Sequence, residues 1–365
     1  MFSSVDHAFM SQALRLAEKG LYSTAPNPRV GCVIVRDEQI VGCGWHEKAG
    51  LAHAEVNALI NAGAASRGAT AYVTLEPCSH FGRTPPCVNA LIDAGIAQVI
   101  MAMQDPNPLV SGRGRALLEH AGIKVKSGLM QTEARALNVG FISRMTHQKP
   151  WVRIKTAASL DGKTALNNGV SQWITGEAAR CDGHRWRARS CAILTGIGTI
   201  LSDDPQLSVR HIETPRQPKR IIVDSRLAIP LEAKALQSGI ETFVFAACVN
   251  DQDKITALQN MGIRVFILPD SAGSVDLNKM MTLLAGLEIN EMLVEAGSGL
   301  NGALIEAGLA DEIIIYLAPH LLGDAAQGMI RLPELTRLDQ KKSLEIKDLR
   351  LIGEDIRIIA SILPT

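Results

Sequence analysis

The chain has 365 residues, of which 47% are apolar and 20% charged, so it can form sizeable cores and is not of the disordered class. Its 37 basic residues balance its 37 acidic residues, which excludes the broad positive surface of a non-specific nucleic-acid binder. The 7 Phe, 3 Tyr and 4 Trp are too few for an extended base-stacking surface. This length favours two domains.

The sequence shows neither a signal-peptide pattern nor a membrane-helix pattern. The first twenty residues mix apolar and charged side chains without a cleavage-site pattern, so we expect no signal peptide. No apolar run reaches the roughly eighteen residues of a membrane helix, so we expect no membrane association. The 7 cysteines are dispersed and odd in number, which is typical of reduced thiols in a cytoplasmic protein.

The first part of the chain alternates helix and strand patterns, which predicts a sheet with helices on both faces. We expect helices at 6–19, 53–64, 88–94, 113–120 and 132–144, and strands at 30–35, 39–43, 69–75, 98–103 and 124–127. A polar stretch that ends in Pro150 follows the last helix. We therefore predict two domains, residues 1–146 and 147–365.

The second part restarts with a strand pattern and is again of the α/β class. Strands are expected at 151–156, 191–194, 220–223, 242–246, 264–268, 291–295, 312–317, 344–351 and 356–362, with helices between most of them.

Four residues of the first part form a candidate catalytic zinc site. His53, Cys78 and Cys87 offer an imidazole and two thiolates, and three protein ligands leave a fourth position for water. Zinc lowers the pKa of that water to about 7, and Glu55 is close enough in sequence to carry its proton to a leaving amine. The pattern matches the zinc deaminase signature except that eight residues, not two, separate the cysteines.

The stretch from Pro77 to Cys87, together with residues 25–31, 44–46 and 52–56, resembles the deaminase half of the bifunctional riboflavin biosynthesis family. The resemblance implies a cytidine-deaminase-like three-layer α/β/α fold. It also implies zinc on His53, Cys78 and Cys87, with Glu55 as the catalytic proton carrier. The substrate contacts that it implies are Asn27, His46, His80 and Arg83.

A glycine pattern of the G-x-G-x-x-G type, at Gly297, Gly299 and Gly302, follows a strand pattern and opens a helix pattern. Free backbone N–H groups there could bind a dinucleotide phosphate, although ordinary turn glycines remain an alternative. The segment lies near the end of the chain and lacks the acidic residue expected about twenty positions later, so a Rossmann fold is not favoured.

Residues 155–162, 171–175, 198–205 and 295–302 resemble the reductase half of the same family. The resemblance implies a dihydrofolate-reductase-like fold that uses NADPH to reduce a ribosylamino group to ribitylamino. The implied NADPH contacts are Ala157, Trp173, Thr199, Asp203, Ser225, Gly297, Ser298, Gly299, Leu300, Asn301, Gly302 and Ala303. The implied substrate contacts are Lys155, Ser171, Arg187, Leu207, Arg210 and Glu295. Arg187 and Arg210 suit a phosphate clamp, because guanidinium groups bind phosphate through paired hydrogen bonds.

The sequence thus predicts a two-step enzyme, with small pyrimidine ribose-phosphates as substrates and a homo-oligomeric assembly. The first step deaminates 2,5-diamino-6-(ribosylamino)-4(3H)-pyrimidinone 5′-phosphate, and the second reduces 5-amino-6-(ribosylamino)uracil 5′-phosphate. Two alternatives stay open at this point. One is a zinc deaminase that edits nucleic-acid bases, and the other is a non-catalytic zinc module closed by a fourth protein ligand, for which His80 is the nearby candidate.

Overall fold

The computed structural model describes residues 1–79, 85–108, 110–237, 239–249 and 251–363. The chain divides into two compact units, Met1–Gln148 and Lys149–Thr365. The boundary predicted between residues 146 and 147 falls in the last turn of the helix that ends at His147. Within the described ranges, no helix combines the length and the apolar character needed to cross a bilayer.

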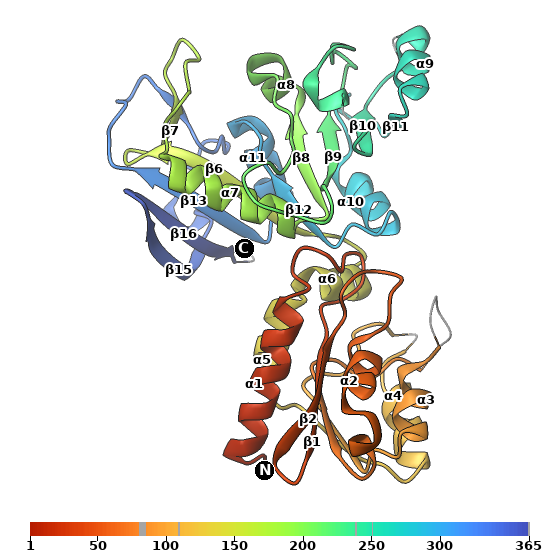
Figure 1. Ribbon diagram of the computed structural model, residues 1–365. Coiled ribbons are helices and arrows are strands. Elements are labelled where there is room, and N and C mark those ends of the chain that lie inside the picture. The colour runs from red at the N-terminus through yellow and green to blue at the C-terminus, as the bar shows by residue number, and fades with distance from the viewer. Residues whose placement is uncertain (80–84, 109, 238, 250, 364–365) are drawn as a thin grey trace. The chain divides into compact units, whose positions relative to one another are not determined.

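The first unit is a five-stranded sheet between two layers of helices (Figure 1). The strand order is β2-β1-β3-β4-β5, with β1 antiparallel to both neighbours and β3, β4 and β5 parallel. The strands are β1 (Gly31–Arg36), β2 (Gln39–Trp45), β3 (Thr70–Val73), β4 (Gln98–Met101) and β5 (Lys124–Ser127). The helices are α1 (Ser4–Glu18), α2 (Ala54–Ala62), α3 (Cys87–Asp93), α4 (Arg113–His120), α5 (Gln131–Leu137) and α6 (Val139–His147), with a 3-10 turn at Gly63–Ser66.

Alternating side chains of strand β1 show how the sheet divides the core of this unit into two layers. Cys32 and Ile34 of β1 pack with α2, α3 and α4, whereas Val33 and Val35 pack with α1, α5 and α6. The unit therefore has the three-layer α/β/α arrangement that we expected.

Helix α2 lies unusually close to strand β2 because two glycines leave room for it. A Cβ atom on Gly42 would lie 2.3 Å from the Ala58 carbonyl oxygen, and one on Gly44 would lie 2.4 Å from the Ala54 carbonyl oxygen. Real Cβ atoms do not make such contacts, so both positions require glycine. The packing fixes the N-terminal end of α2 against the sheet.

The helix predicted over 132–144 is in fact two helices, α5 and α6, which meet at Asn138. The buried Asn138 side chain accepts a hydrogen bond from the Arg29 N–H at 2.8 Å and donates one to the Arg29 carbonyl at 2.9 Å. Asparagine side chains compete with helical backbone for such partners, which explains the break. Two short strands of the second unit, β7 (Lys163–Ala165) and β14 (Gln327–Gly328), were also not predicted.

The second unit contains a nine-stranded sheet of order β11-β10-β9-β8-β12-β6-β13-β16-β15. The seven strands from β11 to β13 are parallel, and β16 and β15 complete the sheet in antiparallel pairing. These strands are β6 (Trp151–Ser159), β8 (Ala192–Gly196), β9 (Lys219–Val223), β10 (Thr242–Ala246), β11 (Arg264–Ile267), β12 (Glu291–Val294), β13 (Glu312–Ala318), β15 (Leu344–Ile352) and β16 (Asp355–Ile362). The helices are α7 (Glu177–Arg189), α8 (Ile197–Asp203), α9 (Gln252–Asn260), α10 (Leu277–Gly286) and α11 (Ser298–Glu306), with 3-10 turns at Lys234–Leu236 and Leu338–Gln340.

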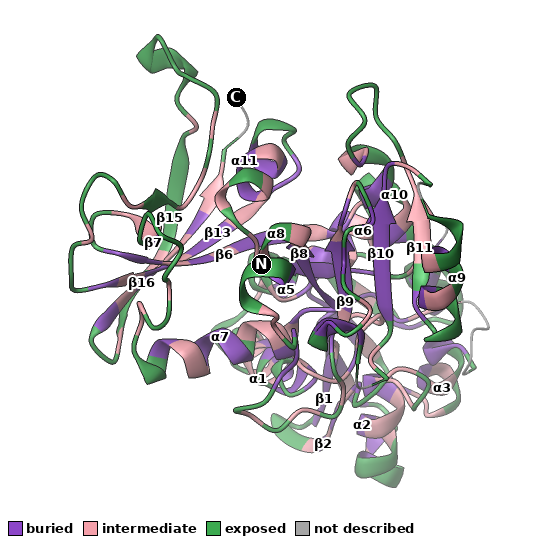
Figure 2. Cartoon of the chain, turned by 90° about the horizontal axis from the view of Figure 1, so that it is seen from above, coloured by how far each residue is buried: buried purple, intermediate pink, exposed green. Residues whose placement is uncertain are grey.

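Burial differs strongly along this sheet. Strand β10 is buried throughout, whereas most residues of the edge strand β15 are exposed (Figure 2). Because the central strands are parallel, the loops after β6, β8, β9 and β12 all leave the same edge of the sheet, where ligands of open α/β sheets bind.

We predict that Asn138→Ala destabilises the first unit by about 2–3 kcal/mol, because the buried Arg29 amide and carbonyl lose their side-chain partners. Urea unfolding followed by circular dichroism measures the change. The exposed Thr132, replaced by alanine on the same helix pair, serves as the control and should leave the midpoint unchanged. An unaltered midpoint for Asn138→Ala would contradict the role assigned to this side chain.

Candidate functional site

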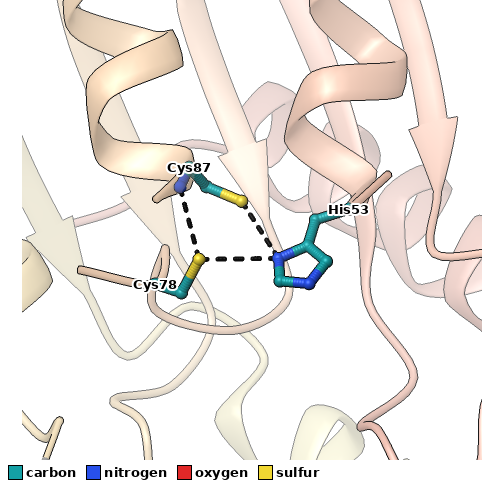
Figure 3. A group of neighbouring side chains, drawn as sticks. All are labelled: His53, Cys78 and Cys87. Carbon is teal, nitrogen blue, oxygen red and sulfur yellow. Dashed lines mark hydrogen bonds between the residues drawn. The ribbon is translucent and has the colours of Figure 1, made fainter. Parts of the chain in front are cut away.

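His53, Cys78 and Cys87 lie together in the first unit, although 34 residues separate the first from the last (Figure 3). His53 is the residue that precedes α2, Cys78 follows β3, and Cys87 opens α3. The His53 Nδ1 atom lies 3.2 Å from Cys87 Sγ and 3.5 Å from Cys78 Sγ. All three potential ligand atoms fall within 4.8 Å of one another.

This geometry fits a zinc ion. Tetrahedral zinc with ordinary Zn–N and Zn–S bonds places its ligand atoms roughly 3.6 Å apart, close to the separations found here. The Cys87 backbone N–H donates to Cys78 Sγ at 3.3 Å, which favours a thiolate at Cys78. The side-chain hydrogen bond from Cys87, together with His53, lowers the pKa of the Cys78 thiol well below its ordinary value. An imidazole beside a stabilised thiolate is the donor set that zinc prefers.

Glu55 lies in the first turn of α2, is only 3% exposed, and faces this cluster. Burial and the charge of Cys78 raise the pKa of the Glu55 carboxyl to about 7. A carboxyl group with a pKa near neutrality can both take up and release a proton during a reaction.

Two of the predicted substrate contacts, Asn27 and His46, lie next to the cluster. The Asn27 side-chain amide donates to His46 Nε2 at 3.0 Å, and His46 Nδ1–H donates to the Ala52 carbonyl at 3.1 Å. The His46 and His53 rings meet edge to face at 5.1 Å between centroids. Burial lowers the pKa of His46, which keeps this imidazole neutral. The other two predicted contacts, His80 and Arg83, lie outside the described residues.

Sequence reasoning missed Glu76, which holds the loop that carries Cys78. This buried carboxylate accepts backbone hydrogen bonds from Asp105 and Arg115 at 3.1 Å and from Gly112 at 3.0 Å. Gly114 packs against the same loop, since a Cβ there would lie 2.2 Å from the Pro77 carbonyl oxygen. The sequence signal that could have identified Glu76 is its position, a carboxylate directly after an apolar strand pattern.

The second unit gathers several predicted substrate contacts around Glu295, which follows β12. Arg187 on α7 donates to both Glu295 oxygens, at 2.7 and 2.6 Å, and to the Ser208 carbonyl at 3.1 Å. Burial alone would raise the pKa of Glu295, but Arg187 and Lys155 outweigh it and hold the pKa at about 2. Burial lowers the pKa of Lys155, which faces Glu295 from β6. Arg187 is thus engaged with protein partners rather than presented as a free phosphate clamp.

Leu207 and Arg210 lie in the segment after α8, and Ser171 lies after β7. The Arg210 guanidinium donates to two neutral side-chain oxygens, Gln206 Oε1 at 3.2 Å and Ser208 Oγ at 3.3 Å, and among the described residues it forms no salt bridge at contact distance. Its charge therefore remains available to an anion.

The predicted cofactor contacts come from neighbouring parallel strands and the segments that follow them. Ala157 lies on β6, Thr199 and Asp203 on α8 after β8, Ser225 after β9, and Gly297 to Ala303 at the start of α11 after β12. Trp173 is 71% exposed, with the Arg180 guanidinium 4.7 Å above its ring. All of these positions except Trp173 belong to segments at the carboxyl edge of the sheet.

The three glycines of the G-x-G-x-x-G pattern have different surroundings. Apart from the adjacent residues and the backbone of α11 itself, no atom lies within 4 Å of a Cβ built on Gly297 or Gly299, so a ligand can approach their backbone. A Cβ on Gly302 would lie 1.8 Å from the Arg331 carbonyl oxygen, so this glycine permits close packing of the chain instead. The buried Asn301 side-chain amide donates to the carbonyls of Ala296 and Met329, and its backbone N–H donates to the Gly297 carbonyl at 3.2 Å, so this residue fixes the start of α11.

We predict that the purified protein holds one zinc ion per chain and that Cys78→Ser removes it, because a hydroxyl is a far weaker zinc ligand than a thiolate. Atomic absorption on the desalted protein measures the content. Cys43→Ser, a change of the same kind at a cysteine outside the cluster, should keep the ion. Full zinc content in Cys78→Ser would show that the metal lies elsewhere.

Two family models match the chain. "Cytidine and deoxycytidylate deaminase zinc-binding region" covers residues 3–103, and "RibD C-terminal domain" covers residues 150–358. The riboflavin biosynthesis protein RibD of Escherichia coli is 47% identical over 96% of this chain and 98% of its own length. The protein of that name from Haemophilus influenzae is 44% identical over 98% of this chain and 97% of its own length.

Solved structures agree with these matches. Acinetobacter baumannii RibD superposes with a TM-score of 0.91 at 43% identity, covering 98% of this chain and 99% of that chain. A Thermotoga maritima protein described as a diaminohydroxyphosphoribosylaminopyrimidine deaminase/5-amino-6-(5-phosphoribosylamino)uracil reductase gives 0.87 at 30% identity, with 98% and 99% coverage. The predicted fold class is confirmed. The chain belongs to the RibD family of bifunctional riboflavin biosynthesis enzymes, which join a zinc-dependent deaminase domain to a reductase domain.

Proposed function

We propose that the first unit, residues 1–146 in our sequence-based division, deaminates 2,5-diamino-6-(ribosylamino)-4(3H)-pyrimidinone 5′-phosphate. The observation that carries this proposal is the buried Glu55 beside the His53, Cys78 and Cys87 cluster. The description of the Thermotoga maritima relative, which names a deaminase of this pyrimidine class, supports the substrate.

Each residue of the first site has a distinct task in this proposal. Zinc held by His53, Cys78 and Cys87 would supply a Lewis acid and a water molecule whose pKa is lowered to about 7. The Glu55 carboxyl group passes one proton of the water to the ring nitrogen beside C2 and the other to the 2-amino nitrogen, so the C2–N bond breaks, ammonia leaves and C2 keeps the oxygen as a carbonyl. The neutral His46 holds the Asn27 amide nitrogen, so Asn27 presents its amide oxygen and second N–H to the pyrimidinone edge, against which the His46 ring lies. His80 and Arg83 are retained as proposed contacts to the ring and the phosphate.

The second unit, residues 147–365 in the same division, reduces 5-amino-6-(ribosylamino)uracil 5′-phosphate in this proposal. NADPH would supply a hydride to C1′ of the sugar. As the C1′–O4′ bond breaks, the Lys155 ammonium donates a proton to the departing oxygen, since burial makes this group more acidic than an ordinary lysine. Arg187 orients Glu295 and with it Lys155, while Arg210 binds the phosphate and Ser171 and Leu207 line the substrate site.

The carboxyl edge of the parallel strands suits NADPH. Helix α11 begins at Gly297 without a side-chain cap, and the open Gly297 and Gly299 expose its first N–H groups, which favours binding of a phosphate. Thr199 and Asp203 on the neighbouring α8, Ser225 after β9 and Ala157 on β6 extend this surface. Trp173 contributes an exposed aromatic face.

The alternatives from the sequence receive less support. The equal numbers of basic and acidic residues do not favour a nucleic-acid track. A structural zinc module would need a fourth protein ligand, and the cluster found among the described residues has three members. The seven cysteines are all free, which suits the reducing cytoplasm in which we place the enzyme.

We also propose that the enzyme is a homo-oligomer that pairs through one face of β15 and β16. Four apolar side chains of β15 are 47–72% exposed: Leu344, Ile346, Leu349 and Leu351. Their cross-strand partners on β16 are Ile362, Ala360, Ile358 and Ile356, so these side chains share one face of the sheet. A contiguous apolar face of this kind is typical of an interface rather than of a solvated surface.

We expect Glu55→Gln to lower ammonia release by about 100- to 10,000-fold, because the amide cannot carry the proton. Zinc content should be unchanged, and NADPH oxidation with the deaminated substrate should proceed at the wild-type rate. A coupled ammonia assay and absorbance at the NADPH band measure the two steps separately. Near-normal ammonia release with zinc still bound would refute the proposed role of Glu55.

The double substitution Leu349→Lys and Leu351→Lys is predicted to lower the oligomeric state, since it places charge in the proposed apolar interface. Sedimentation velocity measures the mass in solution. Ile60→Lys, at an isoleucine that is 74% exposed on the first unit, is the control and should leave the assembly intact. An unchanged mass for the double variant would exclude this face as the interface.

A further inference from the structure

The segment 206–210, which contains two of the proposed substrate contacts, is held by side chains at four successive residues. The Leu207 carbonyl accepts from the buried Arg220 at 3.4 Å, and the Ser208 carbonyl accepts from Arg187 at 3.1 Å. Both backbone groups of Val209 pair with the Gln217 amide, at 2.8 and 3.1 Å. The Arg210 N–H donates to His184 Nδ1 at 3.2 Å.

The conformation of this segment explains why it needs such support. Leu207 adopts a φ of +46°, a left-handed conformation that non-glycine residues rarely take. The segment 206–210 lies between β8 and β9 in sequence and belongs to neither strand. Its backbone groups therefore depend on side-chain partners. Strain of this kind persists only where the surroundings determine the backbone firmly.

His184 is placed to connect this segment with the reaction site. It lies on α7 three residues before Arg187, so both side chains project from one face of the helix. It is 5% exposed, and its ring meets that of His211 edge to face at 4.5 Å. Burial, reinforced by the positive charges of Arg187 and Arg210, lowers the pKa of His184 to about 3. The imidazole is therefore neutral, and its Nδ1 remains an acceptor at physiological pH.

We infer that His184 is a positioning residue for substrate binding in the reductase unit, where it fixes the backbone of Arg210 so that the guanidinium meets the substrate phosphate. Gln217 supports the same segment by binding the backbone of Val209, the residue before Arg210. This inference rests on the proposed function, which assigns Arg210 to the phosphate. One face of α7 then positions the residues that contact both ends of the substrate. Arg187 orients Glu295 near the reacting sugar, and His184 orients Arg210 at the phosphate.

The test compares two substitutions that differ only in whether they keep the acceptor. His184→Phe keeps a ring against His211 but leaves the Arg210 N–H without its partner, whereas His184→Asn keeps an acceptor oxygen close to the position of Nδ1. With the deaminated substrate, we expect His184→Phe to raise KM about 10-fold, with kcat and the KM for NADPH near wild type. We expect His184→Asn to restore most of the lost affinity.

Gln217→Met, which has similar size and no amide, provides an independent variant and should also raise KM selectively. Arg210→Ala separates the inference from the function on which it rests. If Arg210→Ala raises KM but neither His184→Phe nor Gln217→Met does so, the positioning role is wrong and the proposed function stands. If Arg210→Ala leaves KM unchanged, the phosphate assignment itself fails. Equal loss of kcat in His184→Phe and His184→Asn would also overturn the inference, because it would indicate a general packing role.

Discussion

Parallel strand pairing is the constraint on which both sites depend. Parallel strands all end at the same sheet edge, so the segments that follow them meet even when they lie far apart in the chain. In the first unit, β3 leads to Glu76 and Cys78, and the segment after β4 returns to donate three backbone N–H groups to Glu76. In the second unit, β8 and β12 lead to α8 and to Glu295.

Burial then gives these neighbouring groups their chemistry. Loss of water raises the pKa of both carboxylates, and the neighbouring charges then decide the outcome at each. At Glu55, burial and the nearby Cys78 thiolate both raise the pKa, to about 7, so this carboxyl group can act as a proton carrier. Glu295 lies between Arg187 and Lys155, so its pKa falls to about 2 and it stays an anion that orients cations. Each unit therefore uses a buried carboxylate for a different purpose.

Close backbone packing supplies the precision that these sites need. Gly42 and Gly44 bring α2, and with it His53 and Glu55, directly onto β2. Gly302 allows the Arg331 backbone to pack on α11, while Gly297 and Gly299 of the same pattern leave their surroundings open. The same glycine pattern thus contains one glycine needed for packing and two that leave the start of the helix open. The spacing of the glycines alone cannot tell these two roles apart.

The sequence by itself determined the α/β class, most helix and strand positions, and the zinc-type set of His53, Glu55, Cys78 and Cys87, because residue chemistry and periodic burial are local properties. Helix α4 and strands β5 and β10 lie where the pattern predicted them. Only the tertiary structure decided the break at Asn138, the engagement of Arg187 with Glu295, and the support of the 206–210 segment by His184 and Gln217. Each of these depends on a hydrogen bond between segments that the sequence separates, and their partners become evident only once the sheet has brought those segments together.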